Sequence, residues 1–311
     1  MGSSIATLKS FGIENMPTLD VAVFGALELF AERGVPQLPT LPEGQMLVVG
    51  SVNAATTGRI IGEHRNAIFA DESDYKEVIA SAQMIQAALL ISASGGKHAV
   101  EIAQRLKAHN IRAILITHNS DAPAKQFIDP KDVLVFPKNR EPYTYNTSTY
   151  LGVIFASTGE DPAAILRYTE EFVAPKIPEN LASYNAFFIT VPPRFRHVAP
   201  MLLAKFDELF GARVSGRVFT VEHARHATTV IPSPTEFFIS FGEEKVLFGP
   251  PERQLVIPLP PNANHGCMLA VSYYVIGAIQ KQHEPYFKEN IVEYCRRASE
   301  QFGQVINPIV E

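Results

Sequence analysis

Residues 89–119 read LLISASGGKHAVEIAQRLKAHNIRAILITHN, and this stretch decides the fold. An apolar run at 88–91 leads through a turn rich in serine and glycine to a helical pattern at 97–109, and a second apolar run follows at 113–116. Runs without a polar face are typical of strands covered on both sides, which belong to parallel sheets. Because parallel neighbours are joined by a crossover, usually a helix, the stretch predicts one strand–helix–strand unit of a parallel sheet.

The same alternation extends on both sides of this unit. Short apolar runs fall at 46–49, 67–69, 88–91, 113–116 and 133–136, with helical patterns between them at 54–63, 74–84, 97–109 and 121–128. Right-handed crossovers place such helices on both faces of the sheet. The predicted fold class is therefore α/β, a doubly wound αβα sandwich.

A second, weaker cycle follows in the chain. It has a strand at 186–191, a helix near 195–210 and a strand near 214–220. Only twelve residues, with two glycines and two prolines, separate the later apolar runs 236–241 and 254–259. A parallel crossover needs about that many residues for its helix alone. We therefore expect a hairpin or an irregular loop there, and a second sandwich that is abbreviated.

The predicted boundaries divide the chain into three parts. Residues 1–44 hold an N-terminal helix and a linker, 45–180 the first sandwich, and 181–311 the second sandwich with two C-terminal helices. The N-terminal helix, at 18–33, has an apolar face, which predicts packing either on a second copy of the chain or on its own domain. That face carries Leu19, Val23, Leu27 and Phe30.

Composition excludes several classes of protein. Of 311 residues, 46% are hydrophobic and 19% charged, which is ordinary globular usage. The net charge of −5 and the scattered basic residues argue against general nucleic-acid binding. No apolar run approaches the ~20 residues of a membrane span, and residues 1–10 lack the apolar core of a signal peptide. The only cysteines, Cys267 and Cys295, form no disulfide framework or zinc site, so we expect a soluble cytoplasmic protein.

Three polar loops, at 50–53, 92–97 and 145–149, adjoin predicted strand ends and helix starts. In an open parallel sheet such loops gather at the carboxyl ends of the strands. Hydroxyl groups and the free N–H groups of helix starts bind anions there, and a lysine adds positive charge. Each loop alone is more often a helix cap or a turn, but together they predict a phosphate site. Its candidate residues are Ser51, Asn53, Ser92, Ser94, Lys97, Asn146, Thr147 and Ser148.

Residues 89–119 also resemble the core of the sugar-isomerase (SIS) family of phosphosugar-binding domains. That family shows a strand, the motif Ser-x-Ser-Gly-x-Thr, a helix, and a strand that ends in Thr-Asn. Ser92, Ser94 and Gly95 match the motif, and Lys97 replaces its threonine. Gly50-Ser51 resembles the first Gly-Ser loop of the family. Residues 146–149 resemble the start of a helix that is rich in serine and threonine in the family. The resemblance covers about residues 45–160 and implies a five-stranded parallel sheet that holds a sugar phosphate.

Residues 185–300 resemble a degenerate second copy of the same domain, so the chain as a whole resembles two SIS-like sandwiches. The two phosphate loops of this copy are replaced by VPPR at 191–194 and SFGE at 240–243. Because the second replacement adds acidic residues, which repel phosphate, we expect a single phosphate site, in the first half of the chain.

The resemblance also implies catalytic residues. The helix at 203–208 is similar to one that ends in the family's catalytic glutamate, which implies Glu208. The sequence ARHA at 224–227 is similar to the family's Arg-His-Gly-Pro, which implies His226, with His223 as the alternative. Lys288 is a candidate for the family's C-terminal lysine. Each also has a plain interpretation as a solvated helix or turn residue. If Glu208 is the base, Glu208→Gln is expected to leave the fold and the phosphate affinity intact while turnover falls.

The implied reaction is an aldose–ketose isomerisation through an enediol. It needs a carboxylate base for the proton at C2, an acid such as histidine for ring opening, and a cation near the developing oxyanion. It needs no metal or nicotinamide, and the sequence has a motif for neither, so we expect no cofactor. The resemblance implies a homodimer or higher homo-oligomer whose partner is a sugar phosphate, with no nucleic acid or membrane.

Two functions fit these observations. The first is a phosphosugar isomerase, or a related sugar-phosphate deglycase or deaminase, and the retained glutamate and histidine favour it. The alternative is a non-catalytic phosphosugar sensor, which the degenerate second half favours.

Overall fold

A computed structural model describes residues 3–41, 43–81, 84–242 and 248–311. The chain divides into two compact units, which we describe separately. The central unit comprises Val35–Lys138 and Thr149–Gly159, and the terminal unit comprises Met1–Gly34, Asn139–Ser148 and Glu160–Glu311.

The central unit contains a five-stranded sheet in the order β2-β1-β3-β4-β5, and all its pairs are parallel. Its strands are β1 (Met46–Gly50), β2 (Ala67–Ala70), β3 (Ala87–Ile91), β4 (Arg112–Thr117) and β5 (Val133–Val135). Every residue of β1 and β3 is buried, as expected for strands covered on both faces. The predicted parallel sheet is confirmed.

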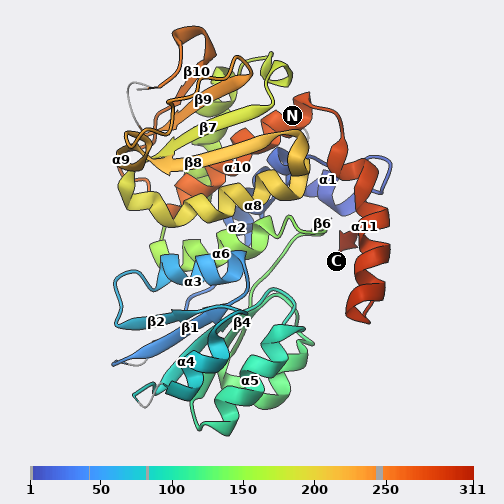
Figure 1. Ribbon diagram of the computed structural model, residues 1–311. Coiled ribbons are helices and arrows are strands. Elements are labelled where there is room, and N and C mark those ends of the chain that lie inside the picture. Colours follow the sequence, from blue (N-terminus) through green and yellow to red (C-terminus); the bar gives the residue numbers. More distant parts are fainter. Residues whose placement is uncertain (1–2, 42, 82–83, 243–247) are drawn as a thin grey trace. The chain divides into compact units, whose positions relative to one another are not determined.

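Helices cover both faces of this sheet, with α3 on one face and α4 and α5 on the other (Figure 1). These helices are α3 (Asn53–Ile61), α4 (Tyr75–Ser81) and α5 (His98–Ala108). Gly58 of α3 approaches β1 so closely that an added Cβ would lie 2.5 Å from Cγ1 of Val48. The helix predicted at 121–128 is instead a 3-10 turn (Pro123–Phe127), followed by another at Pro130–Asp132. Each proline starts its turn, and the residues before them, Ala122 and Asp129, are non-helical, as a following proline favours.

The terminal unit contains a four-stranded parallel sheet in the order β10-β9-β7-β8. Its strands are β7 (Ala186–Val191), β8 (Ser215–Thr220), β9 (Glu236–Phe241) and β10 (Gln254–Ile257). With four strands instead of five, this sandwich is abbreviated, as predicted. Of the two connections expected between β9 and β10, a hairpin or an irregular loop, the hairpin is excluded because the two strands run parallel. Their connection includes a 3-10 turn (Pro251–Arg253), while residues 243–247, with Glu243 among them, lie outside the described residues.

Helices complete the terminal unit. They are α1 (Ser4–Ser10), α2 (Leu19–Arg33), α7 (Pro162–Tyr168), α8 (Ala199–Phe210), α9 (Val221–Ala224), α10 (His265–Gln282) and α11 (Tyr286–Phe302). Helix α8 packs on the sheet, where the ring of Phe206 leaves room only for a glycine at 216. A two-stranded antiparallel pair joins β6 (Glu141–Pro142) to β11 (Ile309–Val310). Helix α6 (Thr147–Thr158) begins in the terminal unit and ends in the central one.

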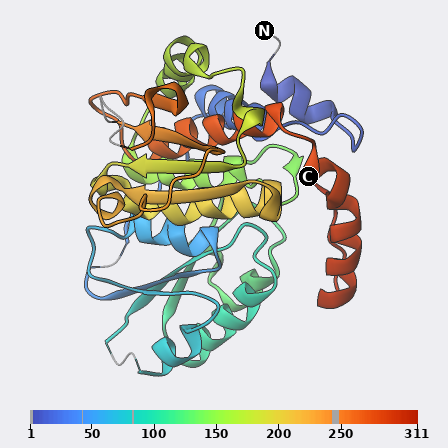
Figure 2. The same ribbon diagram turned by 45° about the horizontal axis from the view of Figure 1, so that its top comes forward.

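The N-terminal helix α2 packs within its own unit, beside α10 (Figure 2). An added Cβ at Gly277 of α10 would lie 2.0 Å from the backbone nitrogen of Asp20. The chain itself therefore buries the apolar face of α2, with Leu19, Val23 and Leu27 fully buried. This face is not free for a second copy, and residues 1–34 are not the separate part that we expected.

Candidate functional site

The two predicted phosphate loops of the central unit lie side by side. Gly50 at the end of β1 pairs in register with Ile91 at the end of β3. Ser51 and Ser92 are the next residues, so both loops start from neighbouring positions at the carboxyl edge of the sheet. This is the edge at which open parallel sheets bind ligands.

Each predicted loop turns into its helix through a residue with a positive φ. The angles are 48° at Val52 before α3, 45° at Lys97 before α5 and 46° at Asn146 before α6. Such values are uncommon for residues other than glycine, and for a β-branched valine they are strained. Strained backbone occurs preferentially at ligand sites. Sequence analysis did not predict this repetition, since no glycine marks the three positions.

The Ser92–Lys97 loop (residues 92–97) is held in place by the segment that follows β4. The hydroxyl group of Thr117 and the backbone N–H of His118 both donate to the carbonyl oxygen of Ala93, at 3.0 Å each. The amide of Asn119 donates to the carbonyl oxygen of Ser94 at 3.1 Å. These contacts fix the loop at the sheet edge before any ligand arrives.

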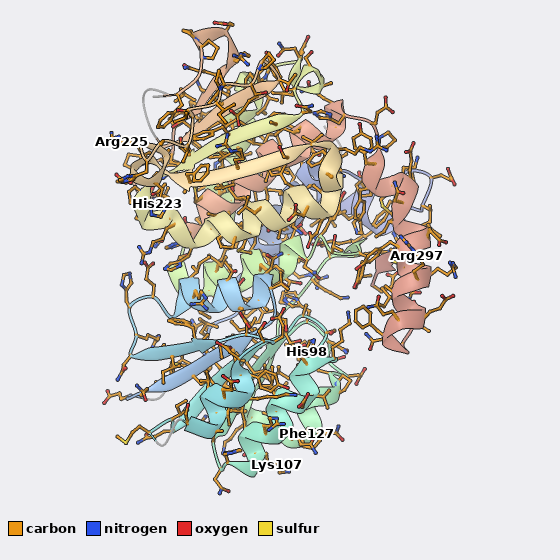
Figure 3. All side chains as sticks on the ribbon, in the orientation of Figure 1. His98, Lys107, Phe127, His223, Arg225 and Arg297 are labelled. Atoms are coloured by element: carbon orange, nitrogen blue, oxygen red, sulfur yellow. The ribbon has the colours of Figure 1, made fainter. Side chains whose placement is uncertain are left out.

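Both serine hydroxyl groups of this loop keep their own protons available. The Oγ of Ser92 accepts the N–H of Gly95 at 3.2 Å, and the Oγ of Ser94 accepts that of Gly96 at 3.3 Å. A hydroxyl group that accepts a hydrogen bond still has an O–H to donate. Lys97 is exposed at the start of α5, where Figure 3 labels the next residue, His98. The loop therefore offers hydroxyl donors and a cation, which suits an anion.

The third predicted loop, in the terminal unit, is already occupied by a carboxylate. Glu141, which is buried, accepts the N–H groups of Thr147 and Ser148 at 2.6 and 2.8 Å and the hydroxyl group of Ser148 at 2.6 Å. Burial raises the pKa of Glu141, although these hydrogen bonds oppose the shift. The N–H groups at the start of α6 thus serve an internal acceptor. Asn146 is partly exposed, and its side chain donates to the carbonyl oxygen of Thr144 at 3.4 Å.

Glu208 lies in an ion pair that the sequence did not predict. Its Oε2 is 2.5 Å from Nζ of Lys205, one turn earlier on α8. The Lys205 side chain has no exposed surface, and its Nζ also donates to the carbonyl oxygen of Thr144 at 2.7 Å. The ammonium group lies 5.6 Å from the ring centre of Tyr273. A lysine three residues before the candidate glutamate was the available signal, since such residues are neighbours on a helix.

A cavity of about 700 Å³ in the terminal unit opens beside this pair. Its lining comes from the loop before α6, the end of α8 with the residues after it, and the first turns of α11. Those residues are Thr144, Asp207, Glu208, Leu209, Phe210, Gly211, Ala212, Arg213, Tyr286, Phe287, Glu289, Asn290, Ile291 and Tyr294. Its size is within the range of about 300–1,000 Å³ that is usual for small-molecule sites.

The structure does not bring the other predicted catalytic residues to this cavity. His223 and His226 are exposed in and after α9, which directly follows the carboxyl end of β8, where Figure 3 labels His223. Lys288 donates to the carbonyl oxygen of Glu14 at 2.6 Å, although its neighbours on α11 line the cavity. None of the three is among the described residues that line it. Of the predicted catalytic residues, Glu208 is the one found in the described lining of this cavity.

Comparison with known proteins assigns the fold. No protein-family model matches the chain, and no curated protein matches it in sequence. Among solved structures, the chain is similar to glucosamine-6-phosphate deaminase from Thermotoga maritima, with 14% identity, 91% of this chain and 96% of that one covered, and a TM-score of 0.60. Tagatose-6-phosphate ketose/aldose isomerase from Escherichia coli gives 12% identity, coverage of 91% and 92%, and a TM-score of 0.59. The chain has the SIS fold.

The SIS fold is shared with the C-terminal domain of glucosamine-fructose-6-phosphate aminotransferase from Francisella tularensis, at 11% identity, coverage of 93% and 97%, and a TM-score of 0.52. At such identities the likeness shows the fold alone, so the chemistry of this chain depends on its own residues. Among the described residues, no cluster of acidic, histidine or cysteine side chains is arranged to hold a metal ion. No helix in the described part of the chain is long and apolar enough to cross a membrane.

Proposed function

We propose that the protein binds a sugar phosphate and catalyses its aldose–ketose isomerisation, or a related deglycation or deamination. The Ser92–Lys97 loop binds the phosphate, with Ser51 and Asn53 of the neighbouring loop close to the ligand. The resemblance to the SIS family implies Glu208 as the catalytic glutamate, and one observation supports that part of the proposal: Glu208 is held by Lys205 at a cavity of ligand size and does not lie in open solvent.

In this proposal Glu208 is the base of the isomerisation. Its carboxylate removes the proton from C2 of the open-chain aldose, and the resulting enediol regains a proton at C1 to form the ketose. The hydroxyl proton moves between O1 and O2, so the step requires no oxidant or reductant. Lys205 is the positioning residue, because its ammonium group holds the carboxylate in one orientation.

The test is incubation of the full chain with a hexose 6-phosphate in D₂O, followed by NMR. Deuterium at C2, or formation of the ketose, is the expected result. Exchange in the parent protein that is lost in Lys205→Met, with sugar-phosphate affinity retained, would support the pair as the proton-transfer site. Asp207→Asn is the matched control, since Asp207 adjoins Glu208 on α8 and lines the same cavity.

A non-catalytic phosphosugar sensor is the second candidate function. The placement of His226 and Lys288 away from the described lining of the Glu208 cavity favours it. A sensor binds hexose phosphates without exchange at C2, so the same NMR experiment separates the two functions. Absence of exchange across a panel of hexose phosphates that do bind would reject the enzyme.

A further inference from the structure

A carboxylate from the central unit already contacts the first of the two phosphate loops. The backbone N–H of Val52 donates to Oε2 of Glu72 at 3.3 Å. Val52 is the residue before α3, it has a positive φ, and 60% of the residue's surface is exposed. The N–H group that an anion would use at this loop therefore has an anionic acceptor beside it.

The order of the strands explains how Glu72 reaches this position. Strand β2 lies next to β1, and Ala70 at its end pairs with Val49. The loop after β2 thus emerges at the same sheet edge as the loops after β1 and β3, with the β1 loop in the middle. The β2 loop is structured, because Oδ1 of Asp74 accepts the N–H of Asp71 and Oδ1 of Asp71 accepts that of Ser73, at 2.8 Å each.

These three neighbouring loops give the sheet edge an uneven distribution of charge. The β2 loop carries the carboxylates of Asp71, Glu72 and Asp74, whereas the β3 loop carries the ammonium group of Lys97. A phosphate dianion on the β1 loop would compete with the Glu72 carboxylate for the same N–H and would be repelled by it. A hydroxyl group would instead donate to that carboxylate and form a charge-assisted hydrogen bond.

We propose that Glu72 determines the orientation and specificity of the ligand. Its carboxylate accepts hydrogen bonds from sugar hydroxyl groups at the β1 loop, whereas the Ser92–Lys97 loop takes the phosphate. Ser51 and Asn53 then contact the sugar and not the phosphate. This inference rests on the proposed binding of a sugar phosphate, and it names the part of the ligand that each loop recognises.

The experiment compares two probes by titration calorimetry at fixed salt, inorganic phosphate and a hexose 6-phosphate. The proteins are the full-length parent, Glu72→Ala, Glu72→Gln and the control Glu77→Gln. Glu77 is an exposed acidic residue five positions further on, in α4, so its replacement makes the same change of charge away from the loop. Circular dichroism verifies that each variant is folded.

We expect Glu72→Ala to weaken hexose 6-phosphate binding by about tenfold or more, and Glu72→Gln by less, since its amide oxygen still accepts a hydrogen bond. Inorganic phosphate affinity is expected to change by less than about twofold in both, because in this inference the Ser92–Lys97 loop takes the phosphate and Glu72 contacts only the sugar, which this probe lacks. Glu77→Gln is expected to match the parent protein with both probes.

Two results would overturn the inference while leaving the proposed function standing. One is an unchanged affinity of both Glu72 variants for hexose 6-phosphate. The other is a rise of about tenfold in their affinity for inorganic phosphate, which would show that the β1 loop takes the phosphate and that Glu72 competes with it. If the parent protein binds neither probe, the proposed function fails, and the inference fails with it.

Discussion

Replacing Glu208 by glutamine is expected to weaken the fold, because the buried Lys205 would lose its counter-charge. The Lys205 side chain has no exposed surface, whereas that of Glu208 is 25% exposed. Removing one partner of a buried ion pair costs about 3–5 kcal/mol of unfolding free energy. Because a glutamine carbonyl still accepts a hydrogen bond from Nζ, we expect the low end, about 3 kcal/mol. This replaces the expectation, drawn from the sequence, that Glu208→Gln leaves the fold intact.

The asymmetry of the pair supplies a sharper test. Lys205→Met is expected to cost less, about 1–2 kcal/mol, since water reaches the remaining Glu208 carboxylate and only the Thr144 carbonyl group loses a donor. The double variant Glu208→Gln/Lys205→Met is then more stable than Glu208→Gln alone, by about 1–2 kcal/mol, because it no longer buries an uncompensated charge.

Urea unfolding followed by circular dichroism measures these differences by linear extrapolation. Asp207→Asn is the matched control, since this exposed neighbour has no ion pair among the described residues, and a change within about 0.5 kcal/mol is expected. The reasoning is refuted if Glu208→Gln unfolds at the parent's urea midpoint, or if the double variant is the least stable protein of the set.

Three further predictions concern the loops and the histidines. Ser94→Ala is expected to weaken sugar-phosphate binding by about tenfold or more in calorimetry, through loss of a hydrogen bond to a charged group, whereas Ser73→Ala binds like the parent; equal affinities would remove Ser94 from the site. Burial lowers the pKa of His118 from 6.5 to about 4, so its contribution to stability is complete above pH 6.5 and is lost as pH falls toward 4, by up to about 3 kcal/mol. His118→Leu is expected to flatten the fall in unfolding free energy over that window, and an equally steep fall would contradict the assignment. His226→Ala is expected to leave reaction of the cyclic sugar and of an open-chain analogue equally unchanged in the NMR assay, because this exposed side chain is not among the described residues that line the Glu208 cavity; slowing confined to the cyclic sugar would contradict this and assign it to ring opening.

Much of the central unit could be predicted from the sequence, because its signals are local. Fully apolar runs such as 88–91 and 113–116 predict strands covered on both faces, and both strands are present in the parallel sheet. The shortened second sandwich followed from the twelve-residue gap between its last two apolar runs. The direction of β10 did not, because a gap that short is compatible with either direction until the partner strand is known.

The candidate site was less predictable, because the residue types in the sequence do not show which groups form its decisive contacts. Glu141 caps α6 from β6, and no residue pattern marks a carboxylate that accepts backbone N–H groups six residues later. Glu72 contacts Val52 only because β2 lies next to β1 in the sheet. The positive φ angles at Val52 and Lys97 result from the tight turn between strand and helix and not from residue type.

The sequence by itself determined the fold class of this protein and the loops at which polar residues gather, because hydrophobic periodicity and turn residues act over a few positions of the chain. Only the tertiary structure decided which partner each charged or apolar group has. It buried α2 against α10, buried the Lys205 side chain beside Glu208, and placed Glu72 beside the first loop. The physical reason is that an ion pair or a buried contact requires two groups to be close in space. Strand order and helix packing set these distances, and neither is encoded in the local pattern of the chain.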